Sequence, residues 1–124
     1  MKKKDDAASA AVTVAVPAPR DPSIHLDKPI YTLSVASEIL ATHPRTLMMY
    51  EHLNMIKPKR TATNRRRYSQ RDLMKLQAIQ TLTRKHGVNL AGVRYILALL
   101  KQIQSAGLRA PEALKDLDVT QLDV

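Results

Sequence analysis

The 124-residue sequence predicts a mainly α-helical fold, namely a winged helix-turn-helix followed by a long dimerisation helix and preceded by a disordered tail. Two observations lead to this prediction. Apolar residues recur at helical spacing in segments between residues 33 and 103. A strongly basic stretch, residues 57–67, interrupts them and has the pattern of a β-hairpin, with turn residues between two short extended runs.

The N-terminal residues 1–29 are expected to be a disordered Ala/Pro-rich tail, because short side chains and prolines bury too little apolar surface to offset the entropy of ordering. A signal peptide is the alternative, with Lys2–Lys4 as its basic region and Ala7–Val16 as its apolar run. Asp5 and Asp6 interrupt that pattern. No run of 18 apolar residues follows, so we expect a cytoplasmic, nucleoid-associated protein without a membrane span.

Residues 30–86 are predicted to form a DNA-binding domain. Residues 30–33 are β-prone, and Ser34 or Ser37 is expected to cap a first helix that ends before His43. Pro44 begins a second helix, residues 44–52, and the two together make a helix-turn-helix candidate. Asn54 then suits the left-handed position that ends the second helix.

The hairpin should consist of an arm at residues 57–60, a turn at 61–64 and a returning strand at 65–68. Ser69 is expected to cap a third helix, with Asp72 three residues later, and Gly87 should end it.

Residues 87–107 are predicted to form the dimerisation helix, capped by Asn89 and ended by residues 106–107. A second apolar stripe, Ile96, Leu99 and Ile103, suggests two packing partners, one of which could be the same helix of a second chain. An intramolecular core in a monomer is the alternative. Residues 108–124 are expected to be a short helix and a trailing acidic tail. The residues assigned to the dimer seam are Leu90, Val93, Leu97 and Leu100.

The net charge of +9 is concentrated where DNA binding is predicted. Residues 30–69 carry seven basic and two acidic residues, whereas residues 108–124 carry two basic and four acidic ones. Because duplex DNA is bound largely through its phosphates, this distribution favours a nucleic-acid partner. The chain has no cysteine and its four histidines are scattered, so no metal or cofactor site is expected. No catalytic arrangement is recognisable either, so we do not expect an enzyme.

Candidate contact residues follow from their chemistry. On the second helix, residues near the entry turn could read base edges, with Arg45 on guanine and Thr46 or Met49 on a thymine methyl group. Leu47 should face the core, and Met48 is expected to be core filler more than Met49. A solvated arginine run and purely packing tyrosines are the alternatives. The assigned DNA-binding residues are His43, Arg45, Thr46, Met49, Tyr50, Lys57, Lys59, Arg60, Arg65, Arg66, Arg67 and Tyr68.

The same segment resembles the winged helix-turn-helix of the MerR family of bacterial transcription regulators. Residues 87–93 and 31–36 are similar to one branch of it, the heat-shock repressor HspR. Met48 departs from the pattern, since many members have arginine there. The residues that carry the resemblance are Thr46-Leu47, Tyr50-Glu51, Asn54-Met55-Ile56, Pro58, Arg60, Arg66, Tyr68 and Asp72.

The resemblance implies a homodimer, joined through the long helix, that binds an inverted-repeat operator in double-stranded DNA. It further implies repression of chaperone genes, including the operon that encodes the DnaK chaperone, with DnaK as co-repressor. A MerR-like regulator of other genes, a DNA-bending factor and an RNA-binding basic module remain alternatives.

Overall fold

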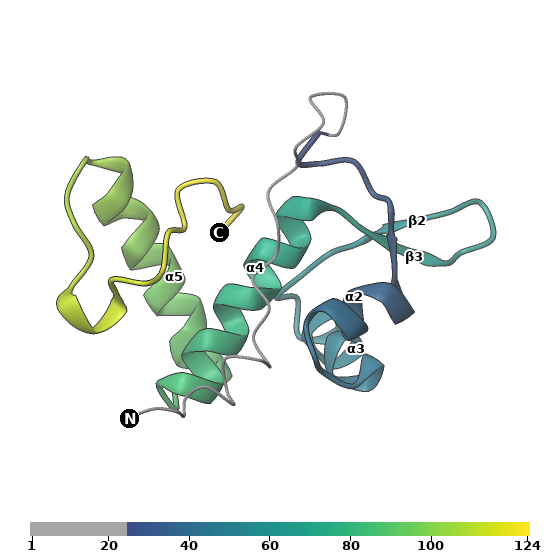
Figure 1. Ribbon diagram of the computed structural model, residues 1–124, viewed down its shortest axis with the longest axis horizontal. Coiled ribbons are helices and arrows are strands. Elements are labelled where there is room, and N and C mark those ends of the chain that lie inside the picture. Colours follow the sequence, from purple (N-terminus) through teal and green to yellow (C-terminus); the bar gives the residue numbers. More distant parts are fainter. Residues whose placement is uncertain (1–24) are drawn as a thin grey trace. The chain divides into compact units, whose positions relative to one another are not determined.

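A computed structural model describes residues 25–124 of the chain (Figure 1). The signal-peptide alternative and residues 1–24 of the predicted tail lie outside the described residues. The chain divides after Leu73 into two compact units. The helix α4 (Gln70–Gln80) begins in the first unit and continues in the second, so this division lies earlier than the boundary that we expected after residue 86.

Two short helices, α2 (Leu33–Ile39) and α3 (Pro44–His52), contact each other in the first unit and form the helix-turn-helix. The predicted caps of α2 were wrong, because Ser34 and Ser37 lie inside the helix. Thr32 is the last extended residue, and its Oγ1 accepts a hydrogen bond from the N–H of Val35 at 3.1 Å. The helix α3 begins at Pro44, as predicted.

Both helices end on a residue in the left-handed conformation. Asn54 closes α3 with φ 62°, as predicted, and the N–H of Met55 donates to the carbonyl of Tyr50 at 2.9 Å. Ala41 closes α2 in the same way with φ 51°, although alanine lacks the polar side chain that favours this conformation. This turn sets the angle at which α3 leaves α2.

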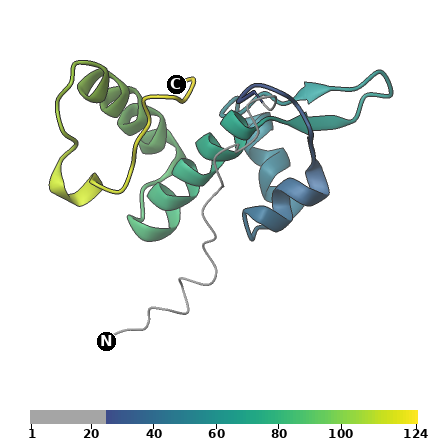
Figure 2. The same ribbon diagram turned by 45° about the horizontal axis from the view of Figure 1, so that its top comes forward.

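Three short strands form an antiparallel sheet in the order β1-β3-β2. They are β1 (Tyr31–Thr32), β2 (Lys59–Arg60) and β3 (Arg66–Tyr68). The predicted wing is confirmed as the β2–β3 hairpin, which projects beyond α2 and α3 in both views (Figures 1 and 2). At its turn the N–H of Thr61 donates to the carbonyl of Arg65 at 2.8 Å, and Asn64 has φ 64°.

The core of the first unit lies beneath these elements, with Ala36, Leu47, Tyr68 and Leu73 completely buried. Residues 25–29 also belong to this unit, which corrects the end of the predicted tail. The carbonyl of Leu26 accepts from the N–H of Arg71, and the Asp27 carboxylate pairs with the Arg71 guanidinium at 2.8 Å. The hydrogen bond of the guanidinium lowers the pKa of Asp27.

In the second unit α4 continues into a wider turn, η1 (Thr81–Lys85), that contacts α5 (Leu90–Ser105). Gly87 follows with φ 64°, as predicted for the end of this helix. The Oδ1 atom of Asn89 accepts from the N–H of Gly92 at 2.8 Å and caps α5, again as predicted. No helix among residues 25–124 has the length and apolar character that a membrane crossing requires.

The C-terminal residues do not trail away as expected. After a single turn, η2 (Glu112–Leu114), the chain returns beside α5, in yellow in Figures 1 and 2. Leu117, Val119 and Leu122 are buried there. The Nζ atom of Lys101 donates to the carbonyls of Thr120 and Leu122 at 2.8 and 2.6 Å, which fastens the acidic segment to α5.

Candidate nucleic-acid interface

The helix α3 has one buried face and one free face. Leu47 and Tyr50 point into the core, with 0% and 5% of their surface exposed. Arg45, Met48 and Met49 lie on the opposite side and are exposed, and Thr46 is half-buried. A helix that is anchored on one side and free on the other has the geometry needed to enter the major groove of DNA.

Met48 is not the core filler that we expected, since 39% of its surface is exposed, close to the 43% of Met49. The reason is that Leu47 and Tyr50, three residues apart, already fix the inward face of this two-turn helix. The free face therefore offers two adjacent thioethers beside Arg45. His43 has a local role as well, because its Nδ1 accepts from the N–H of Arg45 at 3.0 Å and caps α3.

The six cations assigned to phosphate fall into two sets, because side chains alternate along a strand. Arg60 and Arg66 are opposite each other in the hairpin, and so are Lys59 and Arg67. Glu51 of α3 reaches the first pair: its Oε2 lies 2.8 Å from Nη2 of Arg60, and its Oε1 lies 2.6 Å from Nε of Arg66. Burial opposes ionisation of Glu51, but the hydrogen bonds from Arg66 and Arg60 hold its pKa below the ordinary value of 4.5.

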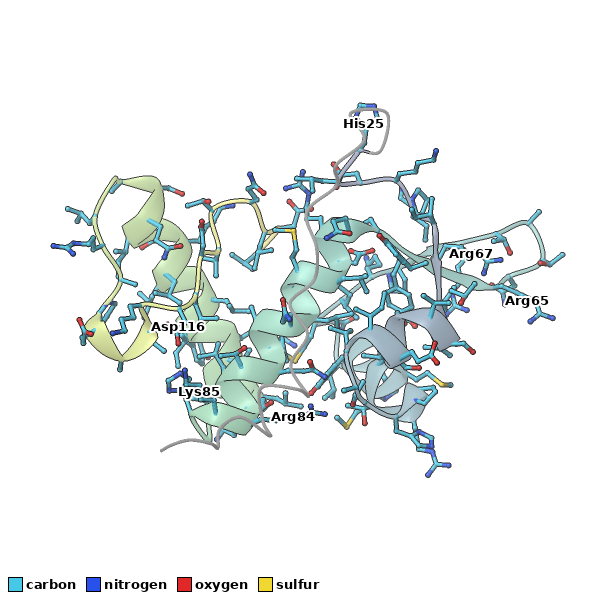
Figure 3. All side chains as sticks on the ribbon, viewed as in Figure 1. His25, Arg65, Arg67, Arg84, Lys85 and Asp116 are labelled. Carbon is cyan, nitrogen blue, oxygen red and sulfur yellow. The ribbon has the colours of Figure 1, made fainter. Side chains whose placement is uncertain are left out.

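The second set lacks such an ion pair, although Lys59 lies near enough to the Asp27 carboxylate to help lower its pKa, and Nη1 of Arg67 donates to the carbonyl of Arg66 at 2.9 Å. No carboxylate lies within 4.0 Å of Lys57, Lys59, Arg65 or Arg67 in the part of the chain that the structure describes. Like charges directly opposite each other, such as Lys59 and Arg67, are unfavourable in an antiparallel pair. Figure 3 shows Arg65 toward the tip of the hairpin and Arg67 nearer its base.

The hydroxyl of Tyr68 is not placed to contact phosphate. Tyr68 has no exposed surface, and its hydroxyl makes no hydrogen bond. Burial raises the pKa of Tyr68 to about 12. The ring of Tyr50 also packs in the core, with 5% of the residue exposed, and the contact of its hydroxyl with DNA stays a prediction.

The residues of the predicted dimer seam are likewise internal. Val93, Leu97 and Leu100 are 0 to 2% exposed within the single chain, and Leu90 is half-buried. These residues pack within the single chain, which leaves Tyr95 and Leu99 outside, 71% and 57% exposed. Sequence reasoning did not single out Tyr95. Its position was a usable signal, because a residue two positions from both Val93 and Leu97 lies on another side of the helix.

In residues 25–124 no three His, Cys, Asp or Glu side chains are grouped so that they could hold a metal ion. The surface that the first unit offers to a ligand combines the free face of α3 with four cations that lack an ion pair: Lys57, Lys59, Arg65 and Arg67.

Comparison with known proteins places this geometry in context. Residues 31–100 match the family model described as MerR HTH family regulatory protein. Over 92 residues the chain is 41% identical to the heat shock protein HspR of Streptomyces coelicolor, covering 74% of this chain and 61% of that protein's length. It is also 31% identical over 94 residues to the HTH-type transcriptional regulator GlnR of Bacillus anthracis and of Bacillus cereus, covering 76% of this chain and 71% of theirs.

Proposed function

The chain belongs to the MerR HTH family of regulatory proteins, and from this premise we propose that it is a DNA-binding transcriptional repressor of heat-shock genes. The observation that carries the proposal is the combination, on one unit, of the free α3 face with wing cations that lack an ion pair. The heat-shock role is supported by the 41% identity to HspR.

In the proposed complex α3 lies in the major groove and the wing lies along the phosphates. In this complex the exposed Arg45 forks onto a guanine edge, and Thr46, Met48 and Met49 present apolar atoms to thymine methyl groups. Lys57, Lys59, Arg65 and Arg67 supply the charge that releases counterions. Repression follows from occlusion of the promoter by the bound protein.

We propose that the active form is a homodimer on an inverted repeat, joined through α5. The supporting observation is the exposed apolar side of α5, where Tyr95 and Leu99 are accompanied by the small exposed residues Ala91 and Ala98. Small residues allow two helices to approach closely, and a second copy of α5 presents the same surface. A dimer also doubles the number of bases that are read.

We further propose the operon encoding the DnaK chaperone as a target, with DnaK as co-repressor in the cytoplasm. Release of DnaK to unfolded proteins would then relieve repression. This part rests on the family resemblance and on the HspR relative.

Mapping the genomic fragments that the full chain binds, with and without purified DnaK, tests these proposals. Fragments beside chaperone operons, bound more tightly when DnaK is present, are the expected result. Fragments that lie only beside unrelated genes would exclude the heat-shock role. The second candidate, a MerR regulator of other genes, has its support in the 31% identity to GlnR.

A further inference from the structure

Two wing arginines share one carboxylate from the helix that faces DNA in the proposed complex. Arg60 and Arg66 are Cα partners on β2 and β3, and each takes one oxygen of Glu51 at the last turn of α3. Hydrogen bonds of this kind, between two ionised groups, are among the strongest that side chains make.

The same network reaches the tip of the hairpin. The Nη1 atom of Arg60 donates to the carbonyl of Asn64, at 3.3 Å. Asn64 is the left-handed residue of the turn, and its N–H donates to the carbonyl of Thr61 at 2.8 Å. One carboxylate on α3 therefore connects to both strands and, through Arg60, to the turn between them.

The pairing also divides the wing charges by availability. The Arg66 side chain is only 22% exposed, and the Arg60 side chain is 36% exposed. Both guanidinium groups are already paired with Glu51. Arg65, in contrast, is exposed and has no carboxylate within 4.0 Å among residues 25–124. The sequence run of three arginines is thus not three equivalent phosphate contacts.

We propose that Glu51 is a positioning residue for sequence-specific DNA binding, which fixes the wing against α3 and withholds Arg60 and Arg66 from phosphate. This inference rests on the proposed DNA-binding function. Its reason is that phosphate contacts add affinity without sequence information, whereas base contacts specify. Because the wing is held against α3, its cations without an ion pair reach phosphates only when α3 lies over the base pairs that it recognises.

Releasing the wing has the opposite effect. Two additional arginines become available on a hairpin that moves independently of α3. Affinity for any duplex therefore rises, and the ratio of the affinity for the selected duplex to that for a random duplex falls. Each additional phosphate contact steepens the dependence of log K on log salt by about 0.9.

The test compares Glu51→Gln with Glu38→Gln. Both remove one negative charge from the first unit, but the exposed Glu38 of α2 has no arginine within salt-bridge distance among the described residues. The probes are a duplex that the wild-type chain selects from a random pool and a random-sequence duplex of equal length. Glu51→Gln is expected to steepen the salt dependence on the random duplex by about one to two and to lower the selected-to-random affinity ratio at least tenfold. Glu38→Gln should leave both values near wild type.

Arg60→Gln provides a second test with a residue at the exposed rim of the network. Because Arg60 is withheld from phosphate, its loss should leave the salt dependence unchanged, and in the Glu51→Gln background it should reverse part of the steepening. Without DNA, the hairpin amide of Thr61 should exchange its hydrogen faster in Glu51→Gln than in wild type.

Equal behaviour of Glu51→Gln and Glu38→Gln in both binding and exchange would overturn the positioning role. The positioning role would also be overturned if Arg60→Gln reduced the dependence of log K on log salt by about 0.9, the value of one phosphate contact. A wild-type chain that binds every duplex equally would instead overturn the proposed function. Hydrogen exchange at Thr61 in Glu51→Gln would still decide whether Glu51 holds the wing: faster exchange supports this role, and unchanged exchange contradicts it.

Discussion

The carboxylate Oε1 of Glu51 lies 2.6 Å from Nε of Arg66, so the last turn of α3 is bonded directly to the central strand of the sheet. This contact changes what the wing arginines can do. Arg66 stands in the middle of the basic run and was assigned to phosphate on that ground, yet its guanidinium is already paired. The cations that we propose to contact DNA lie on either side of it.

Arg65 is therefore the wing arginine whose loss should have the most direct effect on DNA affinity. Arg65→Gln is expected to reduce the salt dependence by about 0.9 for each protomer, across all duplex sequences, with no change in thermal stability. Arg109→Gln, a matched loss of charge at an exposed residue outside the first unit, should have a smaller effect. Identical slopes for the wild-type and Arg65→Gln chains would exclude a phosphate contact at Arg65.

Tyr68 holds a buried hydroxyl without a hydrogen bond, which is an unfavourable arrangement. Tyr68→Phe should raise the free energy of unfolding by up to about 1 kcal/mol, as measured by urea denaturation, and leave DNA affinity unchanged. Tyr31→Phe is the control, because the Tyr31 hydroxyl donates to Oε1 of Gln70 at 3.0 Å and its removal should destabilise the chain. Weaker DNA binding by Tyr68→Phe would restore the hydroxyl to the interface.

Leu99 is central to the proposed dimer surface of α5. Leu99→Glu would place a charge in a closely packed helix pair, so light scattering at micromolar concentration should show a monomer in place of the wild-type dimer. Ala113→Glu adds the same charge at the exposed turn η2 and should remain dimeric. A wild-type chain that is monomeric, or a Leu99→Glu chain that still dimerises, would contradict the proposed interface.

The local parts of this fold could be predicted from the sequence because their signals are local. Asn54, Gly87 and Asn89 each mark a helix end by their own conformational or capping preference, and all three lie where expected. The facing of α3 and α5 could be predicted only in part. Leu47 lies in the core as expected, but both helices carry more apolar residues than one face can bury, and tertiary packing leaves Met48 and Leu99 exposed.

The same limit applies to the C-terminal residues and to the wing. The apolar residues 117, 119 and 122 are spaced too irregularly to predict burial, and their partners Lys101 and Gln104 lie more than ten positions away. Pairing of Glu51 with an arginine was foreseeable from opposite charge. Its simultaneous contact with Arg60 and Arg66 depends on the hairpin register, which the sequence alone leaves open.

The methionines of α3 should make thymine methyl groups part of the recognised sequence. Replacing thymines of the selected half-site by deoxyuridine removes single methyl groups. At one position or more this should weaken wild-type binding by about 0.8 kcal/mol, roughly fourfold. Met49→Ala or Met48→Ala should lose that sensitivity, and thymines outside the half-sites serve as controls. A wild-type chain indifferent to every replacement would exclude methyl readout.

The central claim is that α3 and the wing together recognise duplex DNA by sequence. The most direct measurement is the equilibrium affinity of the full chain, at one salt concentration, for the duplex that it selects, for a scrambled duplex and for RNA of the selected sequence. Binding to the selected duplex that is at least about 10³-fold tighter than to the other two is the predicted result. Equal affinity for all three would contradict the account and would favour a basic module that binds nucleic acid without reading sequence.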